Sequence, residues 1–431
     1  MGIDCSQLSN SLSHKEITEK STSDSHSKSI KALSALNFMA ADIPNGFGPF
    51  LAMYLRYSLN LNPAVIGMVL AGTTLSNLVA QIPLSAWLDH CRYKQRIIAA
   101  ILLISGLSIF VLTHTHRFKI LMGVQLLVGA AWVLYQPAIN SISVGLVGTG
   151  QLSKRLSLNE AFNHGGNFFS AMIAGLLGQY FRLTAIFDFL IVQCIIGAIL
   201  AFQIRQKDTE VYVQEEAILE VQASNQHLSR IWEVLRDKRL LIFSFSSLLF
   251  HMANAAMLPL VSQVLILSTP RKAALATSAC IIVAQLVMVP MALATGFLVE
   301  RIGRKPVFAL GFLVLALRGF LFTLSLNPYY LVAVQGLDGI GAAIFGVSLG
   351  IVAADLSKGK GRFNLIQGVI ITGMGIGSTF SQLLGGWLSD KVGGYNTAFL
   401  ALSGAALIGF VFFWILMPET KLPTPTETLE N

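Results

Sequence analysis

The chain has 431 residues, of which 54% are hydrophobic and 12% are charged, and its mean hydropathy is +0.66. A soluble domain typically carries about 25% charged residues, so this composition excludes a water-soluble globular fold. The formal charge of +8 is carried by short basic clusters between apolar blocks, which is typical of membrane orientation signals and not of nucleic-acid binding. We therefore expect an all-α membrane protein without a nucleic-acid partner.

The N-terminal segment is rich in Ser, Lys and His and lacks the apolar core of a secretory signal. This composition predicts a disordered cytoplasmic tail over residues 1–31. The four cysteines, Cys5, Cys91, Cys194 and Cys280, show no CxxC pair and no metal-ligand spacing. The sequence therefore predicts no structural disulfide, no metal site and no cofactor.

Apolar blocks of membrane-spanning length follow, since a helix needs about 20 residues to cross a ~30 Å hydrocarbon core. They predict twelve spans: 32–56, 64–87, 96–114, 118–146, 159–181, 183–204, 240–267, 273–298, 306–326, 328–354, 366–388 and 395–417. The spans form an N-terminal six-helix bundle over 32–204 and a C-terminal one over 240–417. A central loop over 205–239 and a tail over 418–431 complete the chain. Lys and Arg are about three times as frequent on one side, which predicts that both termini, the central loop and the C-terminal tail are cytoplasmic.

Several sequence segments recur at a nearly constant distance along the chain. Residues 125–129 (QLLVG) and 335–339 (QGLDG) both begin with Gln and end with Gly, at an offset of 210. Gly175 and Gly385 share that offset, and residues 38–42 (FMAAD) match 250–254 (FHMAN) at an offset of 212. This pattern predicts two related halves.

The loop after the eighth predicted span carries the most specific motif of the chain. It reads Gly296-Phe-Leu-Val-Glu300-Arg301-Ile-Gly303-Arg304-Lys305. This run resembles the G-x-L-x-[DE]-R-x-G-R-K signature of the major facilitator superfamily. The resemblance extends to chain length, span number and the long central loop. It implies two pseudo-symmetric six-helix bundles.

The loop after the second span is a degraded copy that keeps Asp89 and Arg92 but lacks both glycines. An acid at the end of one helix and arginines on the next can form a charge-assisted latch. A latch present in only one conformer biases the equilibrium between conformers. The alternative is that the basic residues only anchor the loops on the cytoplasmic side. We predict a cytoplasmic gate formed by Asp89, Arg92, Gly296, Glu300, Arg301, Gly303 and Arg304.

Polar residues inside the spans are candidates for a transport site, because charge in a bilayer is costly. The resemblance implies that spans one, four, seven and ten line a central cavity. We predict that substrate or a proton is bound by Asp42, Asn45, Gln125, Asn163, Asn167, His251, Asn254, Gln335 and Asp338. Each of these side chains could instead bond across helices without contacting substrate. Arg318 lies on a span expected to be peripheral, where it would either reach the outer surface or pair with an acid.

Two departures from the superfamily weaken an interpretation as a drug:proton antiporter. Many proton-coupled members carry an arginine where this chain has Gln125, and span five lacks the proline-containing glycine motif associated with antiporters. Proton coupling through Asp42 or Asp338 stays open, because burial can raise a carboxyl pKa. Such acids favour a cationic or zwitterionic solute, or a proton as the coupling ion.

The combined prediction is a secondary active transporter that moves a small solute by alternating access and is not an enzyme. A nucleotide-binding loop is lacking, since Gln151 follows the glycine spacing of 145–150, and HExxH does not occur. A non-transporting sensor or receptor on the same fold is the alternative, and export versus import stays open. We expect a monomer surrounded by lipid. A bacterial inner membrane is expected, because loops are short and no N-x-[ST] sequon occurs.

Overall fold

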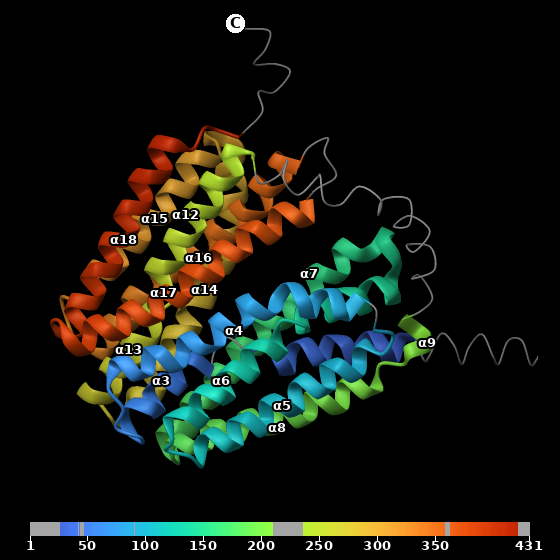
Figure 1. Ribbon diagram of the computed structural model, residues 1–431, viewed down its shortest axis with the longest axis horizontal. Coiled ribbons are helices and arrows are strands. Elements are labelled where there is room, and N and C mark those ends of the chain that lie inside the picture. The colour runs from blue at the N-terminus through green and yellow to red at the C-terminus, as the bar shows by residue number, and fades with distance from the viewer. Residues whose placement is uncertain are drawn as a thin grey trace, which may run out of the picture.

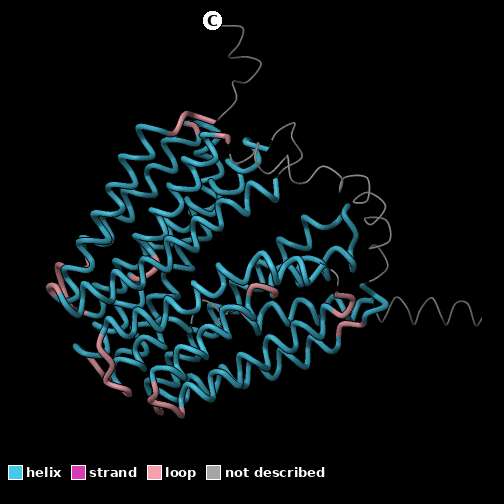
Figure 2. Tube along the Cα trace, in the orientation of Figure 1, coloured by secondary structure: helices cyan, strands magenta, loops and turns pink. Residues whose placement is uncertain are grey.

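The computed structural model describes residues 26–41, 43, 47–89, 91–209, 236–357 and 363–420, and in these ranges it is almost wholly α-helical without a β-strand (Figure 2). The first half contains a helix over 26–40, α3 (Phe47–Tyr57), α4 (Pro63–Asp89), α5 (Lys94–Thr113), α6 (Phe118–Trp132), α7 (Tyr135–Tyr180), α8 (Leu183–Gln203) and α9 (Gln206–Thr209). The second half contains α12 (Lys238–Asn254), α13 (Met257–Ser268), α14 (Ala273–Ile302), α15 (Arg304–Leu321), α16 (Pro328–Ser357), α17 (Phe363–Lys391) and α18 (Gly394–Leu416).

Eight helical stretches among the described residues are long and apolar enough to cross a membrane. They are Pro63–Gln81, Lys94–Thr113, Phe118–Gly148, Leu183–Gln203, Lys238–Ser268, Ala273–Ile302, Pro328–Ser357 and Gly394–Leu416. Four further helical segments lie at the remaining expected spans: 26–40 with α3, α7 beyond Gly148, α15 and α17. This arrangement is consistent with the twelve predicted spans.

The two halves form separate helix bundles (Figure 1). Both bundles have the same internal close contacts. In the first bundle, a Cβ on Gly129 would clash with the backbone oxygen of Thr73, and in the second a Cβ on Gly339 would clash with that of Ala284. Gly166 and Gly377 repeat this relation against Phe38 and Leu248. Each pair of contacts is offset by 210 or 211 residues. The predicted two-fold repeat is therefore present in the packing as well as in the sequence.

Two connections differ from the sequence prediction. Residues 26–31 are helical, whereas the tail was expected to extend to residue 31. Ser29 is fully buried and donates a hydrogen bond to Asp208 (2.5 Å), which attaches this segment to the end of the bundle. The predicted loop between spans four and five is also helical, because α7 runs through it with a kink at Gly148 (φ +67°).

The seventh predicted span is divided into α12 and α13 by a proline. Pro259 has no N–H, so the carbonyl of Ala255 loses its helical partner. The side-chain amide of Gln382 on α17 donates to this carbonyl at 3.0 Å. The Ala256 N–H donates to the Ser381 hydroxyl at 2.9 Å. Side chains of α17 thus satisfy the backbone groups at the break, as a helix interrupted within a membrane requires.

The bundles meet along the antiparallel helix pairs α4 with α17 and α7 with α14, and α3 also packs against α13. We call the end of the molecule that holds residues 26 and 420 the terminal end, and the opposite end the far end. The contacts between Gly67 and Gly386 and between Gly178 and Ala274 lie toward the far end. Toward the terminal end the two bundles diverge (Figure 1). The molecule is therefore closed at its far end and splayed at its terminal end.

Candidate functional site: a cavity between the two bundles

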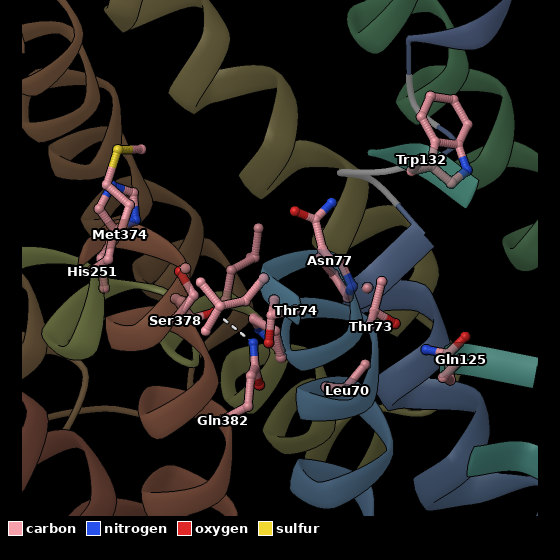
Figure 3. A pocket seen from close by; sticks show the side chains of 18 of the residues that line it. Leu70, Thr73, Thr74, Asn77, Gln125, Trp132, His251, Met374, Ser378 and Gln382 are labelled. Carbon is pink, nitrogen blue, oxygen red and sulfur yellow. Dashed lines mark hydrogen bonds between the residues drawn. The ribbon is translucent and has the colours of Figure 1, made fainter. Parts of the chain in front are cut away.

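A cavity of about 610 Å³ lies between the bundles, halfway along α4 and α17. It is lined by α3, α4 and α6 from the first bundle and by α12, α13, α15, α16 and α17 from the second. Its polar lining consists of Thr73, Thr74, Asn77, Gln81, Gln125, Trp132, His251, Asn254, Arg318, Asp338, Ser378 and Gln382. Figure 3 shows side chains from both bundles around this space. A polar space at this depth, shared by two bundles, is suited to hold a solute in contact with both.

A buried charge cluster forms one wall of the cavity. The Arg318 guanidinium donates to the carboxylate of Asp338, and its second amino group donates to Asn254 Oδ1 at 2.8 Å. The Gln335 amide donates to the other Asp338 oxygen at 3.0 Å. Charge-assisted hydrogen bonds of this kind are among the strongest in proteins. The cluster places a cation and an anion side by side, so the two charges offset each other.

Arg318 was expected on a peripheral helix, but its side chain points inward and is 1% exposed. Its Nε also contacts the Met257 sulfur at 3.3 Å. Arg318 therefore pairs with an acid and does not reach the surface, which was one of the two alternatives left open for it. Helical spacing alone did not decide between the two alternatives, because the acid that Arg318 on α15 contacts lies on another helix, α16.

His251 lines the cavity beside an aromatic cluster. Its ring packs edge-on against Phe345, with centroids 4.8 Å apart, and Phe250 stacks on Phe345 at the same separation. Among the described residues its Nε2 atom is buried without a hydrogen-bond partner. The histidine thus carries a polar atom that the protein leaves unpaired.

Gln125 and Trp132 present different groups from α6 at the other end of the cavity (Figure 3). The Trp132 indole N–H donates to the Ser105 hydroxyl at 2.9 Å, which holds the ring in place. Gln125 is 3% exposed, and its side-chain oxygen has no partner within the described part of the chain. Trp132 therefore has its indole N–H engaged within the first bundle, whereas the Gln125 oxygen is buried without a partner among the described residues.

A row of polar side chains on α4 lines the cavity. It was not predicted, although the sequence carries a signal for it. Thr74, Asn77 and Gln81 recur at intervals of three and four residues, which places them on one helix face. Thr74 accepts a hydrogen bond from Thr379 of α17 at 2.9 Å, across the interface between the bundles. The family resemblance implies a cavity lined by spans one, four, seven and ten, and it does not include spans two and eleven, which carry these residues.

The predicted site residues do not all gather in this cavity. Gln125, His251, Asn254 and Asp338 line it, whereas Gln335 is fully buried behind Asp338. The predicted Asp42 and Asn45 lie outside the described residues. Asn163 and Asn167 lie elsewhere, on α7, where Asn167 donates to Asn163 at 3.3 Å.

A second polar cluster occupies the terminal end of the second bundle, at the predicted gate. Arg304 is largely buried, and its guanidinium binds Asp355 on α16 (3.1 Å) and Glu300 (3.1 Å). Gly303 adopts φ +100°, a conformation suited to glycine, between α14 and α15. Glu419 accepts hydrogen bonds from the Arg304 N–H at 3.0 Å and from the N–H of the following residue, also at 3.0 Å.

These contacts lie within the second bundle, where Arg304 connects α14, α16 and the segment that follows α18. Sequence reasoning missed Asp355 and the capping role of Glu419. Among the other predicted gate residues, Arg301 and Arg92 are exposed and Gly296 is half-buried. The side chain of Asp89 lies outside the described part of the chain.

Comparisons with known proteins agree with this architecture. The Major Facilitator Superfamily model matches residues 32–299 and 275–430. An uncharacterized MFS-type transporter of Mycobacterium tuberculosis strain H37Rv is 36% identical over 391 residues, which cover 90% of this chain and 93% of the relative. The corresponding protein of strain CDC 1551 / Oshkosh gives the same values.

Solved structures share the fold at low sequence identity. The nucleoside transporter NupG superposes with a TM-score of 0.73 at 18% identity, covering 90% of this chain and 98% of that one. A D-xylose-proton symporter gives 0.69 at 13% identity, covering 92% and 98%. A bacterial homolog of the human lysosomal transporter Spinster, in an inward-facing and occupied conformation, gives 0.72 at 12%, covering 90% and 96%. From the family match along the chain and its 36% identical relatives, we conclude that this chain belongs to the Major Facilitator Superfamily and is an integral membrane transporter.

Proposed function

We propose that this protein is a secondary active transporter that binds a small solute in the cavity between its bundles and moves it by alternating access. The observation that carries the proposal is the position of the cavity, which both bundles line halfway through the molecule. A rocking motion of the bundles would expose such a site to one side at a time. The basic excess of the sequence supports a cytoplasmic terminal end. The conformer described here is then open to the cytoplasm.

The register of α7 and α14 supports a specific closing contact at the terminal end. The two helices are antiparallel and pair Gly178 with Ala274, and His164 Nδ1 bonds to Gln285 Oε1 at 3.0 Å. With about 3.6 residues in each helical turn, continuing this register toward the terminal end brings Lys154 and Glu300 beside each other.

Both Lys154 and Glu300 are exposed in the present conformer, and Glu300 forms an ion pair with Arg304 at the start of α15. We infer that Glu300 exchanges part of this contact for Lys154 when the terminal end closes. An exposed ion pair contributes about 0–1 kcal/mol, enough to bias the two conformers without locking either.

Proton coupling is the finer part of the proposal. Asp338 already has a cationic partner in Arg318, so it would take up a proton only in a conformer that separates the pair. Asp42 is the second acid proposed for this role, on the basis of its place in the first span. A bacterial plasma membrane is the proposed location, supported by the mycobacterial relatives.

The test is solute flux in proteoliposomes with an imposed pH gradient. The parent is compared with Asp338→Asn and Asp42→Asn, using a panel of neutral, cationic and anionic solutes. We expect accumulation of at least one solute by the parent, and its dependence on the gradient to be lost in one of the variants. Absence of protein-dependent flux for the whole panel would favour a sensor on the same fold. Flux that both variants retain with unchanged pH dependence would refute proton coupling through these acids.

A further inference from the structure

A polar cluster joins the two bundles at the closed far end, away from the cavity. Arg56 lies in the last turn of α3, and its Nη1 atom donates to the Leu61 carbonyl at 3.2 Å. This bond holds the guanidinium beside the loop between α3 and α4. α3 packs against α13 of the second bundle (Figure 1). A cation of the first bundle is therefore fixed where the second bundle comes closest.

The second bundle presents a phenol and a carboxylate to this cation. The Tyr395 hydroxyl, in the first turn of α18, contacts the Arg56 guanidinium and lies within the field of the Asp390 carboxylate. Tyr395 also donates to Gln263 Oε1 on α13 at 3.3 Å, which fixes the direction of the ring. The Asp390 side chain is 13% exposed, and its ion pair is with the exposed Lys391 next to it in the chain (3.1 Å).

The packing of α4 on α17 independently places Asp390 at the same level as Arg56. The Pro63 carbonyl, two residues beyond Leu61, lies against Gly386 of α17. Asp390 follows Gly386 by about one helical turn toward the far end, and Leu61 precedes Pro63 in the same direction. The carbonyl that anchors Arg56 and the carboxylate of Asp390 thus lie beside each other across the two bundles.

This cluster is complete only while the far end is closed. The guanidinium is half-buried, and its Nε atom is buried without a partner among the described residues. The hydroxyl and carboxylate of the facing bundle offset part of the cost of burying the cation, since charge-assisted contacts are stronger than neutral ones. When the bundles separate at this end, water takes their place. A contact made in one conformer and not in the other biases the equilibrium between them.

We propose that Arg56 is the far-end gate residue of the transport cycle: it joins the first bundle to Tyr395 and Asp390 of the second while the far end is closed, and it releases them when that end opens. This inference rests on the proposed alternating-access function. It adds the counterpart of the Lys154–Glu300 contact inferred for the terminal end. Each conformer is then held by a polar contact across the bundles at its closed end.

The test is the alkylation rate of a single cysteine at Thr74, in the α4–α17 interface, with a membrane-impermeant maleimide confined to the far side of the membrane. The rate follows the population that is open at the far end, so it reports even a rare conformer. Arg56→Gln should label at least about fivefold faster than the parent, because a lost hydrogen bond to a charged group shifts the equilibrium by this much or more. Arg56→Lys, which keeps the charge, should stay closer to the parent.

Arg271→Gln is the matched control. Arg271 is exposed in the connection between α13 and α14 at the same end, and its side chain forms no ion pair or hydrogen bond within the described part of the chain. Its replacement removes the same charge and should leave the labelling rate unchanged. An unchanged rate in Arg56→Gln, or an equal increase in Arg271→Gln, would overturn the inference.

A double-variant cycle tests the contact itself. Arg56→Gln and Tyr395→Phe should each speed the labelling of the cysteine at Thr74. The combined variant should fall short of the product of the two separate increases, because both changes remove the same contact. Increases that simply multiply would show that the two side chains act independently, and would overturn the contact on which the gate depends.

Unfolding and loss of transport are read separately. The native Cys194 is fully buried against Gly106 within the first bundle, and as the single cysteine it should resist maleimide in detergent in every variant. Labelling of Cys194 that rises together with labelling at Thr74 would assign the effect to unfolding and overturn the gate. Faster labelling at Thr74 without flux of any solute would keep the gate and refute transport. Flux in the parent with equal labelling in the parent and Arg56→Gln would do the reverse.

Discussion

The far-end closure depends on two glycines that let α4 and α17 touch, and enlarging one of them should shift the conformational equilibrium. A Cβ on Gly386 would lie 2.5 Å from the Pro63 carbonyl oxygen and 3.0 Å from the Gly67 Cα. Both neighbours are backbone, so no side chain can rotate away. An ordinary contact begins at 3.4 Å, so the helices must separate by about 0.9 Å even for Gly386→Ala, and overpacking of this kind costs about 1–3 kcal/mol.

Because about 1.4 kcal/mol is a tenfold change in an equilibrium constant, this cost predicts a shift of about five- to 150-fold toward the conformer that is open at the far end. The measurement is the alkylation rate of a cysteine introduced at Thr74, which lies in the α4–α17 interface, on a background without the native cysteines. A membrane-impermeant maleimide added from the far side should label it at least about fivefold faster in the variant, the lower end of that shift. Gly404→Ala is the matched control, since nothing lies within 4 Å of its added Cβ. An unchanged labelling rate in a folded Gly386→Ala protein would refute the argument that backbone contact at Gly386 holds the far end closed.

Three further predictions concern charged groups. Asp338→Asn should lower thermal stability in detergent, by about 3–5 kcal/mol if the unpaired Arg318 stays buried, and adding Arg318→Met should recover most of the loss; a double variant less stable than the single one would contradict the pairing. Glu419→Ala should speed hydrogen exchange of the two capped amides at the start of α15 by about two- to thirtyfold, the equivalent of a lost cap, whereas unchanged exchange would show that Glu419 does not cap this helix. Cysteines at Lys154 and Glu300 should form a disulfide under oxidation more readily in the Gly386→Ala background than in the parent, and equal cross-linking would contradict the inferred closing register.

Much of the fold could be predicted from the sequence because membrane burial leaves a strong one-dimensional signal. Apolar blocks, their number and the offset of 210 residues depend only on composition and spacing. The helix breaks were not predicted, since the effect of Pro259 depends on whether a neighbouring helix can satisfy the freed carbonyl. That partner, Gln382, lies 127 residues from Ala255 in the chain.

The cavity was predicted less completely, for a different reason. Gln125, His251, Asn254 and Asp338 were found because polar residues on apolar helices are conspicuous. Gln335 was found as a neighbour of Asp338 on the same helix. Arg318, which donates to Asp338 and Asn254 from another helix, was not assigned to them, because helical spacing reports neighbours within one helix and not across two. The pairing of Asp338 with Arg318 on another helix places a cation beside an acid that the sequence left without an assigned partner.

The break between α12 and α13 also links two sequence positions that lie far apart. Pro259 removes a donor from the Ala255 carbonyl, and Gln382 supplies one in its place. A related chain with a residue other than proline at position 259 has the N–H that restores the helical hydrogen bond to carbonyl 255. A side-chain donor at position 382 is then no longer needed for that carbonyl. Relatives that lack the proline at position 259 should therefore tolerate residues without a side-chain amide at position 382. The two positions should change together during divergence of the family.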